Sequence, residues 1–331
     1  MVAAKASGEI IILNKQFIAD ATGDRDAGGL WGFRTLTVCG MVIVLFIASH
    51  IIRNQIQGSQ SVNQPTVPNK TYQRVVALSP SIVEIIYELG LDDQLAGVSR
   101  YSNHPPEAAQ KTEIGGYLDL NMEKMITLDP DCVILLAEQS ELARRCNRLN
   151  IHTLMVDHNH TRGILESIQT IGNALGAGQE AAKATKAMQQ RVKELTTSFK
   201  RAAAPPRVLV CISRDVAATR PEGVIAAGSA GFHRELIEMA GAVNAYEGPV
   251  AFPSLSREKL IGLDPDIIID LVNTRTWAEF GEDHLLGSWK AFSELRAVQN
   301  QRVIMIHGDQ HLIPGPRFPQ TLEQFIRNIH P

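Results

Sequence analysis

The chain has 331 residues, of which 44% are hydrophobic, and its formal net charge is −3. This length and apolar content are sufficient for two globular domains of ordinary size. The absence of a basic cluster argues against nucleic acid as a partner. The four cysteines include no C-x-x-C pair, so the sequence offers no disulfide framework and no zinc or redox site.

An apolar segment near the N-terminus is long enough to cross a membrane. Residues 35–52 read TLTVCGMVIVLFIASHII and contain no Asp, Glu, Lys or Arg. Together with Leu30, Trp31 and Phe33 in front of it, this segment can span a hydrocarbon core of about 30 Å. We therefore expect a transmembrane helix over residues 30–52.

This segment is interpreted as a signal anchor that is not cleaved. A signal peptide is the alternative, but the leader before the apolar run is long, and Ala48-Ser49-His50 is a poor cleavage site. We expect residues 1–29 to form a cytoplasmic tail and the polar residues 53–71 to form a linker. The body of the protein would then face the periplasm or extracytoplasmic space.

From residue 72 onward, strand and helix patterns alternate. Residues 74–78 form an apolar strand, and Ser79-Pro80 starts a helix that ends at Gly90. Further apolar strands are predicted over residues 95–98, 132–136 and 152–156. This alternation predicts a mostly parallel sheet covered by helices, in a first lobe over residues 72–175.

A long helix then connects this lobe to a second one. Helical patterning covers residues 179–201, without Gly or Pro, and Pro205-Pro206 stops it. At Arg207 the strand and helix pattern begins again. The sequence therefore predicts an α/β protein of two Rossmann-like lobes, with a backbone helix in residues 176–204 and a second lobe over residues 205–331.

Two segments of the chain repeat each other. Residues 120–136 read LNMEKMITLDPDCVILL and residues 255–271 read LSREKLIGLDPDIIIDL. The repeat distance is far too long for a solenoid, so it indicates two similar lobes. Each LDPD is interpreted as a turn and not as an acid–base pair. Pro restricts φ, and the Asp side chains can accept hydrogen bonds that cap the turn. Each copy also places a glutamate two residues into its helix, at Glu123 and Glu258.

From residue 74 to residue 330, the sequence resembles the class III, helical-backbone family of periplasmic solute-binding proteins. These proteins serve ABC importers of cobalamin, ferric siderophores and haem, and the spacing here is most similar to the cobalamin branch. The resemblance rests on several motifs in order, namely Leu78-Ser79-Pro80-Ser81 with Glu84, the loop 101–106, the turn Leu128-Asp129-Pro130-Asp131, Ser256-Arg257-Glu258 and Gly315-Pro316-Arg317.

The resemblance implies a ligand cleft between the lobes, at the carboxyl ends of the strands. Aromatic side chains there would suit a large planar macrocycle. By this resemblance, Tyr117 matches an aromatic that packs on the corrin ring in the cobalamin branch, and it could alternatively ligate haem iron. Arg214 and Arg220 could face an anionic ligand or could be solvated loop charges. The expected cleft residues are Tyr101, His104, Tyr117, Arg214, Arg220, Phe252, Asp309, Gln310, His311 and Arg317.

The resemblance also implies that Glu123 and Glu258 pair with arginines of a membrane permease. Two carboxylates at a fixed separation would set the docking orientation. The simpler alternative is that each glutamate only favours the positive end of its helix.

The sequence therefore favours an extracytoplasmic, monomeric substrate-binding protein that delivers a corrinoid to a permease. A ferric-siderophore or haem-binding protein of the same fold and a membrane-anchored sensor ectodomain are alternatives. An enzyme, such as a lyase or chelatase, has little support, because there is no G-x-S-x-G, P-loop or dinucleotide motif. No resident cofactor or metal is expected, since His158 and His160 have no further ligands at a suitable spacing.

Overall fold

The computed structural model describes residues 71–330, apart from residues 117–118, 217–221 and 229–230. The chain divides into a unit over Met1–Thr66 and a unit over Val67–Pro331, and the second is described here. The predicted membrane segment 30–52 lies outside the described residues. Within the described residues, no helix combines the length and the apolar character needed to cross a membrane.

The first lobe contains a sheet of five parallel strands with the order β3-β2-β1-β4-β5. The central strand pairs Val75 with Leu95 on one side and with Cys132 on the other. The all-parallel sheet confirms the α/β class predicted from the sequence. Its strands are β1 Val75–Ala77, β2 Leu95–Val98, β3 Thr112–Glu113, β4 Cys132–Leu136 and β5 Thr153–Val156, and its helices are α3 Pro80–Glu88, α4 Met122–Thr127, α5 Ser140–Arg148 and α6 Thr161–Leu175.

The second lobe contains a mixed sheet with the order β11-β10-β6-β7-β9, and β8 also pairs with β6. The strands β6, β8, β10 and β11 are parallel, whereas β7 runs antiparallel to both β6 and β9. The strands are β6 Arg207–Asp215, β7 Glu222–Ala226, β8 Val243–Asn244, β9 Ser254–Leu255, β10 Ile267–Val272 and β11 Val303–His307, and the helices are α8 Phe232–Met239, α9 Arg257–Leu263, α10 Thr274–Trp289, α11 Arg296–Gln299 and α12 Phe318–Ile329.

Five short 3₁₀ helices complete the described secondary structure, and all of them lie in connections. They are η1 Asp92–Gln94, η2 Pro106–Gln110, η3 Ala137–Gln139, η4 Lys290–Phe292 and η5 Asp309–His311.

The two LDPD turns have the same structure in both lobes. In each turn the first aspartate adopts a left-handed backbone, with φ of 46° at Asp129 and 39° at Asp264. The second aspartate then binds the start of the first strand of its lobe. Asp131 accepts a hydrogen bond from the backbone N–H of Arg74 at 3.1 Å, and Asp266 accepts one from that of Arg207 at 2.9 Å. Both turns therefore anchor the central strand, as expected for a structural motif.

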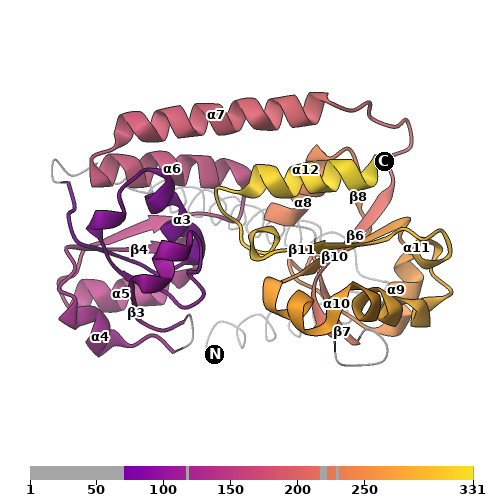
Figure 1. Cartoon of the computed structure of the whole chain (residues 1–331), viewed down its shortest axis with the longest axis horizontal. Helices are drawn as coiled ribbons and strands as arrows, with labels where there is room; N and C mark the ends of the chain where they lie inside the picture. The colour runs from indigo at the N-terminus through magenta and orange to yellow at the C-terminus, as the bar shows by residue number, and fades with distance from the viewer. Residues whose placement is uncertain (1–70, 117–118, 217–221, 229–230, 331) are drawn as a thin grey trace, which may run out of the picture. The chain divides into compact units, whose positions relative to one another are not determined.

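Helix α7, Gly178–Thr197, connects the two lobes. It packs against α6 of the first lobe and α12 of the second, which lie alongside it in Figure 1. It ends at Thr197, four residues earlier than the sequence pattern suggested. Beyond this end, the ring of Phe199 stacks on His330, with centroids 4.3 Å apart.

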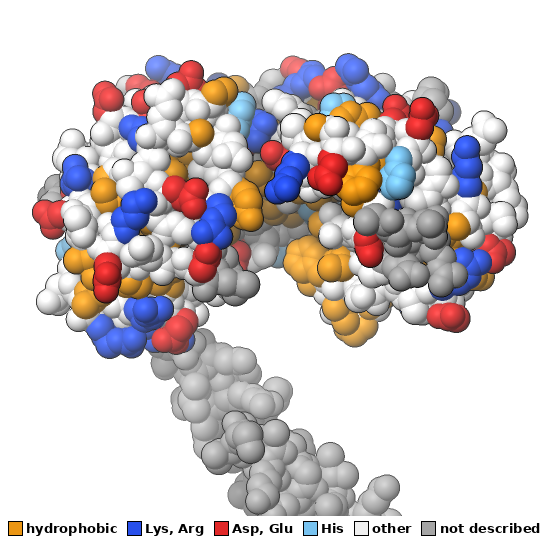
Figure 2. Space-filling view, turned by 60° about the horizontal axis from the view of Figure 1, so that its bottom comes forward, with side chains coloured by type: hydrophobic (Ala, Val, Ile, Leu, Met, Phe, Trp, Pro, Cys, Tyr) orange, Lys and Arg blue, Asp and Glu red, His pale blue; other side chains and the backbone are white. Residues whose placement is uncertain are grey.

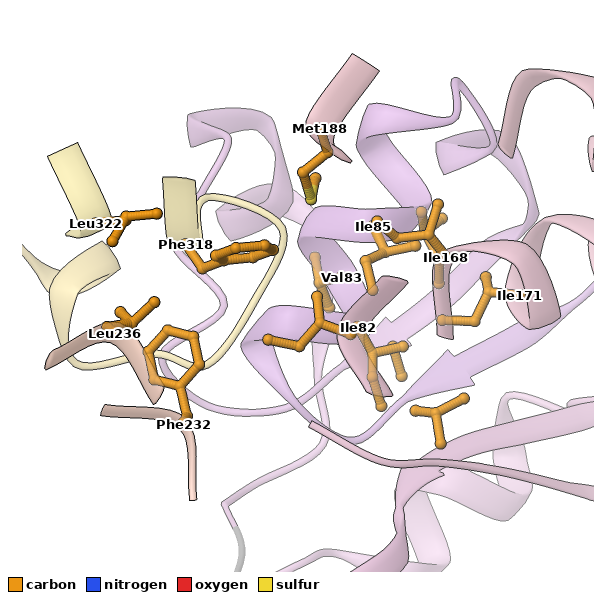
Figure 3. Close-up of a cluster of buried hydrophobic side chains, with 14 of the residues drawn as sticks. Ile82, Val83, Ile85, Ile168, Ile171, Met188, Phe232, Leu236, Phe318 and Leu322 are labelled. Atoms are coloured by element: carbon orange, nitrogen blue, oxygen red, sulfur yellow. The ribbon is translucent and has the colours of Figure 1, made fainter. Parts of the chain in front are cut away.

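One of the buried hydrophobic clusters in the described residues contains side chains of both lobes and of α7. Figure 3 shows residues of α3 and α6 on one side, and residues of α8 and α12 on the other. Because burying apolar side chains drives folding, this shared core holds the lobes together. The labelled members are Ile82, Val83, Ile85, Ile168, Ile171, Met188, Phe232, Leu236, Phe318 and Leu322.

Candidate functional site

Loops that follow the strands of both lobes meet in a cleft. A cavity of about 170 Å³ is lined from the first lobe by Glu84, Tyr101, Asn103 and His104, and from the second by Thr274, Asp309, Gln310, Ile313 and Arg317. Figure 2 shows a furrow between the lobes, with hydrophobic side chains at its margin. The structure thus brings together five of the predicted cleft residues, namely Tyr101, His104, Asp309, Gln310 and Arg317.

An ion pair joins the two sides of this cavity. Arg317 donates from Nε to Oε2 of Glu84 at 2.9 Å, and its second N–H group reaches Oε1 at 2.5 Å. The Glu84 side chain is only 4% exposed and the Arg317 side chain 19%. Gly315 permits this approach, because a Cβ at that position would lie 3.0 Å from the Cβ of Ser81.

The loop after β2 presents Tyr101 to solvent. The residue has a left-handed backbone with φ of 68°, and 72% of its surface is exposed. A bulky residue rarely adopts this conformation, which costs about 1–3 kcal/mol and is concentrated at functional sites. The backbone N–H of Asn103 donates to the Tyr101 carbonyl at 2.9 Å. The loop therefore exposes the aromatic ring of Tyr101 to solvent, although burial of such a ring would be more favourable.

A second cavity between the lobes has a volume of about 380 Å³ and an aromatic wall formed by Phe252. This ring is 61% exposed. Its loop is held close to Gly228, whose N–H donates to the Ala251 carbonyl at 2.8 Å, and a Cβ on Gly228 would clash with the Val250 carbonyl. The lining residues are His158, Asn159, His160, Ile212, Ala227, Gly231, Phe232, His233, Ala251, Phe252, Leu312 and Pro314.

Two of the histidines in this lining are buried and neutral. Burial lowers the pKa of both His158 and His233 to about 4. His158 Nδ1 lies 2.8 Å from Ser81 Oγ, and His233 Nε2 donates to the His311 carbonyl at 2.9 Å. His158 Nε2 makes no hydrogen bond with a described residue.

The third histidine, His160, lies at the junction of the lobes and is exposed. Its Nδ1 is 2.7 Å from Glu235, whose other carboxylate oxygen accepts hydrogen bonds from the backbone and hydroxyl of Thr161. A residue of α8 therefore caps the first turn of α6. The described residues contain no group of three or more side chains suited to hold a metal ion.

Two predicted cleft residues have other roles. The Arg214 side chain is 1% exposed and pairs with Asp270 at 2.7 Å, so the expectation of a ligand contact or a solvated charge is wrong. Trp289 Nε1 donates to the same carboxylate at 2.8 Å. His311 is 4% exposed and lies 3.0 Å from the hydroxyl of Thr321. It lines neither cleft cavity, because its side chain packs beneath the loop.

The remaining two predicted cleft residues, Tyr117 and Arg220, lie outside the described residues. Residues on either side of Tyr117 are held by polar contacts. Arg100 pairs with Asp119 at 2.7 Å, and Asp119 accepts the N–H of Gly116 at 3.0 Å. The Arg100 hydrogen bond lowers the pKa of the Asp119 carboxyl.

Several residues that line the cleft cavities were not predicted from the sequence, and Asn103, Thr274 and His158 are among them. Thr274 lies two residues after the end of β10, and the carboxyl end of a parallel strand was a signal that could have identified it. Its N–H donates to Asp309 at 2.9 Å, which links the two loops at this edge. Asn103 lies in the predicted loop, whereas nothing local distinguished His158 as a buried cavity residue.

The two glutamates expected at helix starts occupy equivalent positions. Asn121 caps α4 by accepting the Lys124 N–H at 2.8 Å, and Ser256 caps α9 by accepting the Lys259 N–H at 3.2 Å. Glu123 and Glu258 each follow two residues after the cap, and both are exposed. Hydrogen bonds to its own backbone N–H and to Ser256 lower the pKa of Glu258.

Comparisons with known proteins agree with this architecture. The periplasmic binding protein family matches residues 75–310 of the chain. An uncharacterised ABC transporter substrate-binding lipoprotein of Bacillus subtilis is 27% identical over 81% of this chain and 83% of its own length. The vitamin B12-binding protein of Vibrio cholerae is 26% identical over 76% of this chain and 87% of its own length.

The similarity extends to solved structures. The crystal structure of the periplasmic vitamin B12-binding protein of Vibrio cholerae superposes with a TM-score of 0.67 at 25% identity, covering 78% of this chain and 96% of that one. The family consists of binding proteins rather than enzymes, and its members work outside the cytoplasm. The chain therefore belongs to the periplasmic binding protein family, as the extracytoplasmic substrate-binding protein of an ABC importer.

Proposed function

We propose that the transported ligand is a corrinoid of the cobalamin class, held in the cleft between the lobes. The observation that carries this proposal is an exposed aromatic ring in each lobe, on loops that line the cleft cavities. Tyr101 is 72% exposed and Phe252 is 61% exposed. Together they offer two apolar faces to a ligand that enters between them.

Exposed rings of this size are best explained by a flat partner. Aromatic side chains bury a large area and prefer stacked or edge-on contacts with other planar groups. A corrinoid has a large planar ring with amide-bearing arms at its edge. Asn103, Gln310 and Thr274 supply donors and acceptors around the first cavity, which suits such arms. A sugar or an amino acid would leave most of the aromatic surface uncovered.

The relatives support the same ligand class. The vitamin B12-binding protein of Vibrio cholerae matches three quarters of this chain and most of its own length. That likeness covers both lobes, so it includes the loops that line the cleft. The family resemblance of Tyr117 to a stacking aromatic adds a third candidate wall, to be tested together with Tyr101 and Phe252.

We further propose that Glu123 and Glu258 dock the loaded protein on its permease. Each carboxylate lies in the first turn of a capped helix, at the equivalent position of its lobe. Neither forms an ion pair with another described residue, so both are available to basic side chains of a partner. Two exposed acids on a rigid body favour one orientation of the complex.

Membrane attachment through residues 30–52, with residues 53–71 as a tether, belongs to the same proposal. The apolar run is long enough to span the bilayer. The Bacillus subtilis relative is a lipoprotein, so membrane attachment by another means occurs among relatives of this chain. Protease treatment of intact cells or spheroplasts, followed by mass spectrometry of the N-terminus, distinguishes an intact anchor from a cleaved leader.

A ligand titration tests the corrinoid proposal. The full chain, purified in detergent, is titrated with cyanocobalamin, cobinamide, haemin and a ferric siderophore, and tryptophan fluorescence and visible absorbance are followed. Tight binding of the two corrinoids alone is the expected result. A shift of the haem Soret band with no corrinoid binding would replace the corrinoid by haem, and saturable binding of the siderophore alone would replace it by an iron chelate.

A further inference from the structure

A cavity larger than either of the two cleft cavities lies outside the cleft. It has a volume of about 660 Å³ and is walled by α3, α7 and α12 together with the loops that contain His104-Pro105 and Pro316-Arg317. Its lining consists of Glu84, Tyr87, Glu88, His104, Pro105, Ala184, Ala187, Met188, Arg191, Pro316, Arg317, Pro319, Gln320 and Glu323. We refer to it as the α7 groove. It combines elements of both lobes with the helix that connects them.

The α7 groove shares a wall with the proposed ligand cleft. Glu84, His104 and Arg317 line both the groove and the smaller cleft cavity. The Glu84–Arg317 ion pair therefore stands between the two spaces. The aromatic rings of Tyr101 and Phe252 line only the cleft cavities, so the groove has its own chemistry.

The lining of the α7 groove carries more negative than positive charge. Its two arginines are already paired, Arg317 with Glu84 and Arg191 with Glu323, the latter at 2.7 Å. Glu88 forms no hydrogen bond or ion pair with another described residue. Partial burial and, to a smaller degree, the nearby Glu84 raise the pKa of the Glu88 carboxyl, although the residue as a whole is exposed. Its charge thus lacks a counterion that the groove itself could provide.

The rest of the groove is mainly apolar. Ala184, Ala187 and Met188 contribute to the lining from α7, and Tyr87 contributes to it from α3. An alkyl chain can pack on such a wall, and an aromatic face attracts a cation. A ligand with a positive group and a short apolar body would therefore satisfy both the free carboxylate and the apolar wall.

We propose that the α7 groove is a second binding site, which takes a small organic cation of the alkylammonium class. The ammonium group lies against the Glu88 carboxylate and the ring of Tyr87, and the alkyl part covers Ala187 and Met188. Because the occupant contacts both α3 and α7, it stabilises the folded arrangement of these two helices by mass action. This inference does not depend on the identity of the ligand in the cleft.

Choline and its neutral isostere, in which carbon replaces the ammonium nitrogen, test the proposal. The full chain in detergent is titrated with each compound by calorimetry, and its thermal unfolding is followed in parallel. Saturable choline binding with a rise in Tm is expected, and the isostere should bind at least about tenfold more weakly, since it lacks the charge. No saturable binding of choline, or equal binding of both compounds, overturns the proposal.

Two matched pairs of variants locate the site. Glu88→Gln removes the free charge and should weaken choline binding about tenfold, whereas Glu180→Gln, on an exposed carboxylate of α7 outside the groove, should leave it unchanged. Ala187→Trp fills the groove from an exposed position and should abolish binding, whereas Ala182→Trp should not. Binding that survives both Glu88→Gln and Ala187→Trp places choline elsewhere and refutes the site.

Discussion

Glu84 and Arg317 are 233 positions apart in the sequence, yet they form a two-pronged ion pair that joins α3 of the first lobe to the start of α12 in the second. The pair lies at the point where the ligand cleft and the α7 groove share a wall. It therefore links the family motifs Ser79-Pro80-Ser81 and Gly315-Pro316-Arg317 physically. Neither motif could make this contact without the other.

Removing one partner of this pair should destabilise the protein strongly. Arg317→Met leaves the Glu84 carboxylate, only 4% exposed, without a counterion, which should lower the free energy of unfolding by about 3 kcal/mol. The control is Arg191→Met, whose ion pair with Glu323 is more exposed and should contribute at most about 1 kcal/mol. Urea unfolding of both variants measures the difference, and equal losses would contradict the role of the buried pair.

The shared core predicts that the stabilities of the two lobes are coupled. Phe318 is 1% exposed and belongs to the same cluster as Ile82 and Val83 of the first lobe. Phe318→Ala should cost about 3–5 kcal/mol and increase hydrogen exchange in α3 of the other lobe. Phe292→Ala removes an equally buried ring from a cluster confined to the second lobe, and should leave α3 protected. Unchanged exchange of α3 in Phe318→Ala would show that the lobes are not coupled through this core.

The sequence predicted the parts of the fold that depend on local pattern. The strands expected over residues 95–98 and 132–136 coincide with β2 and β4, and both LDPD segments are turns. Apolar runs bounded by turn residues are strong local signals. The two-residue strand β9 and the antiparallel β7 were not found, because such short strands are defined by their pairing partners rather than by their own sequence.

Burial of polar side chains was the main failure of prediction. Arg214 directly follows an apolar strand segment, where a charged residue is usually exposed. Its partner Asp270 lies 56 positions away within β10, and neither sequence segment contains a pattern that predicts this ion pair. His311 was misplaced for the same reason, since its contact with Thr321 depends on how α12 packs. By contrast, Arg317 was correctly placed, because its motif carries a family resemblance.

The aromatic walls of the cleft predict a loss of ligand affinity without loss of stability. Replacing Tyr101 or Phe252 with Ala removes an exposed ring, so the fold should be almost unaffected. Binding of the corrinoid should weaken about tenfold for each ring. Leu149→Ala, which removes an exposed side chain at the end of α5, is the matched control. Fluorescence titration measures the corrinoid affinity of the three variants. Unchanged affinity in Tyr101→Ala or Phe252→Ala would exclude that ring from the ligand site.

The buried histidines predict a loss of stability in acid. The pKa values of His158 and His233 are lowered from 6.5 to about 4 by burial, so between these values the unfolded chain binds more protons than the folded one. Stability should therefore fall as the pH falls through this window, by at most about 1.4 kcal/mol per pH unit for each histidine. Urea unfolding at several pH values should show a flatter dependence in His158→Asn and in His233→Asn than in the wild type.

The proposed docking surface predicts a separation between binding and transport. Reversing the charge of Glu123 and Glu258 together should abolish uptake of the ligand by cells that depend on this protein, because two like-charged contacts would then face the basic side chains of the permease. Ligand affinity of the purified variant should be unchanged, since neither glutamate lines a cleft cavity. Asp93→Lys with Glu180→Lys makes the same change of net charge at other exposed positions and should transport normally. Normal uptake by the Glu123→Lys, Glu258→Lys variant would contradict the docking role and would mean that these carboxylates only stabilise the ends of their own helices. Reduced ligand affinity would instead show that they belong to the ligand cleft.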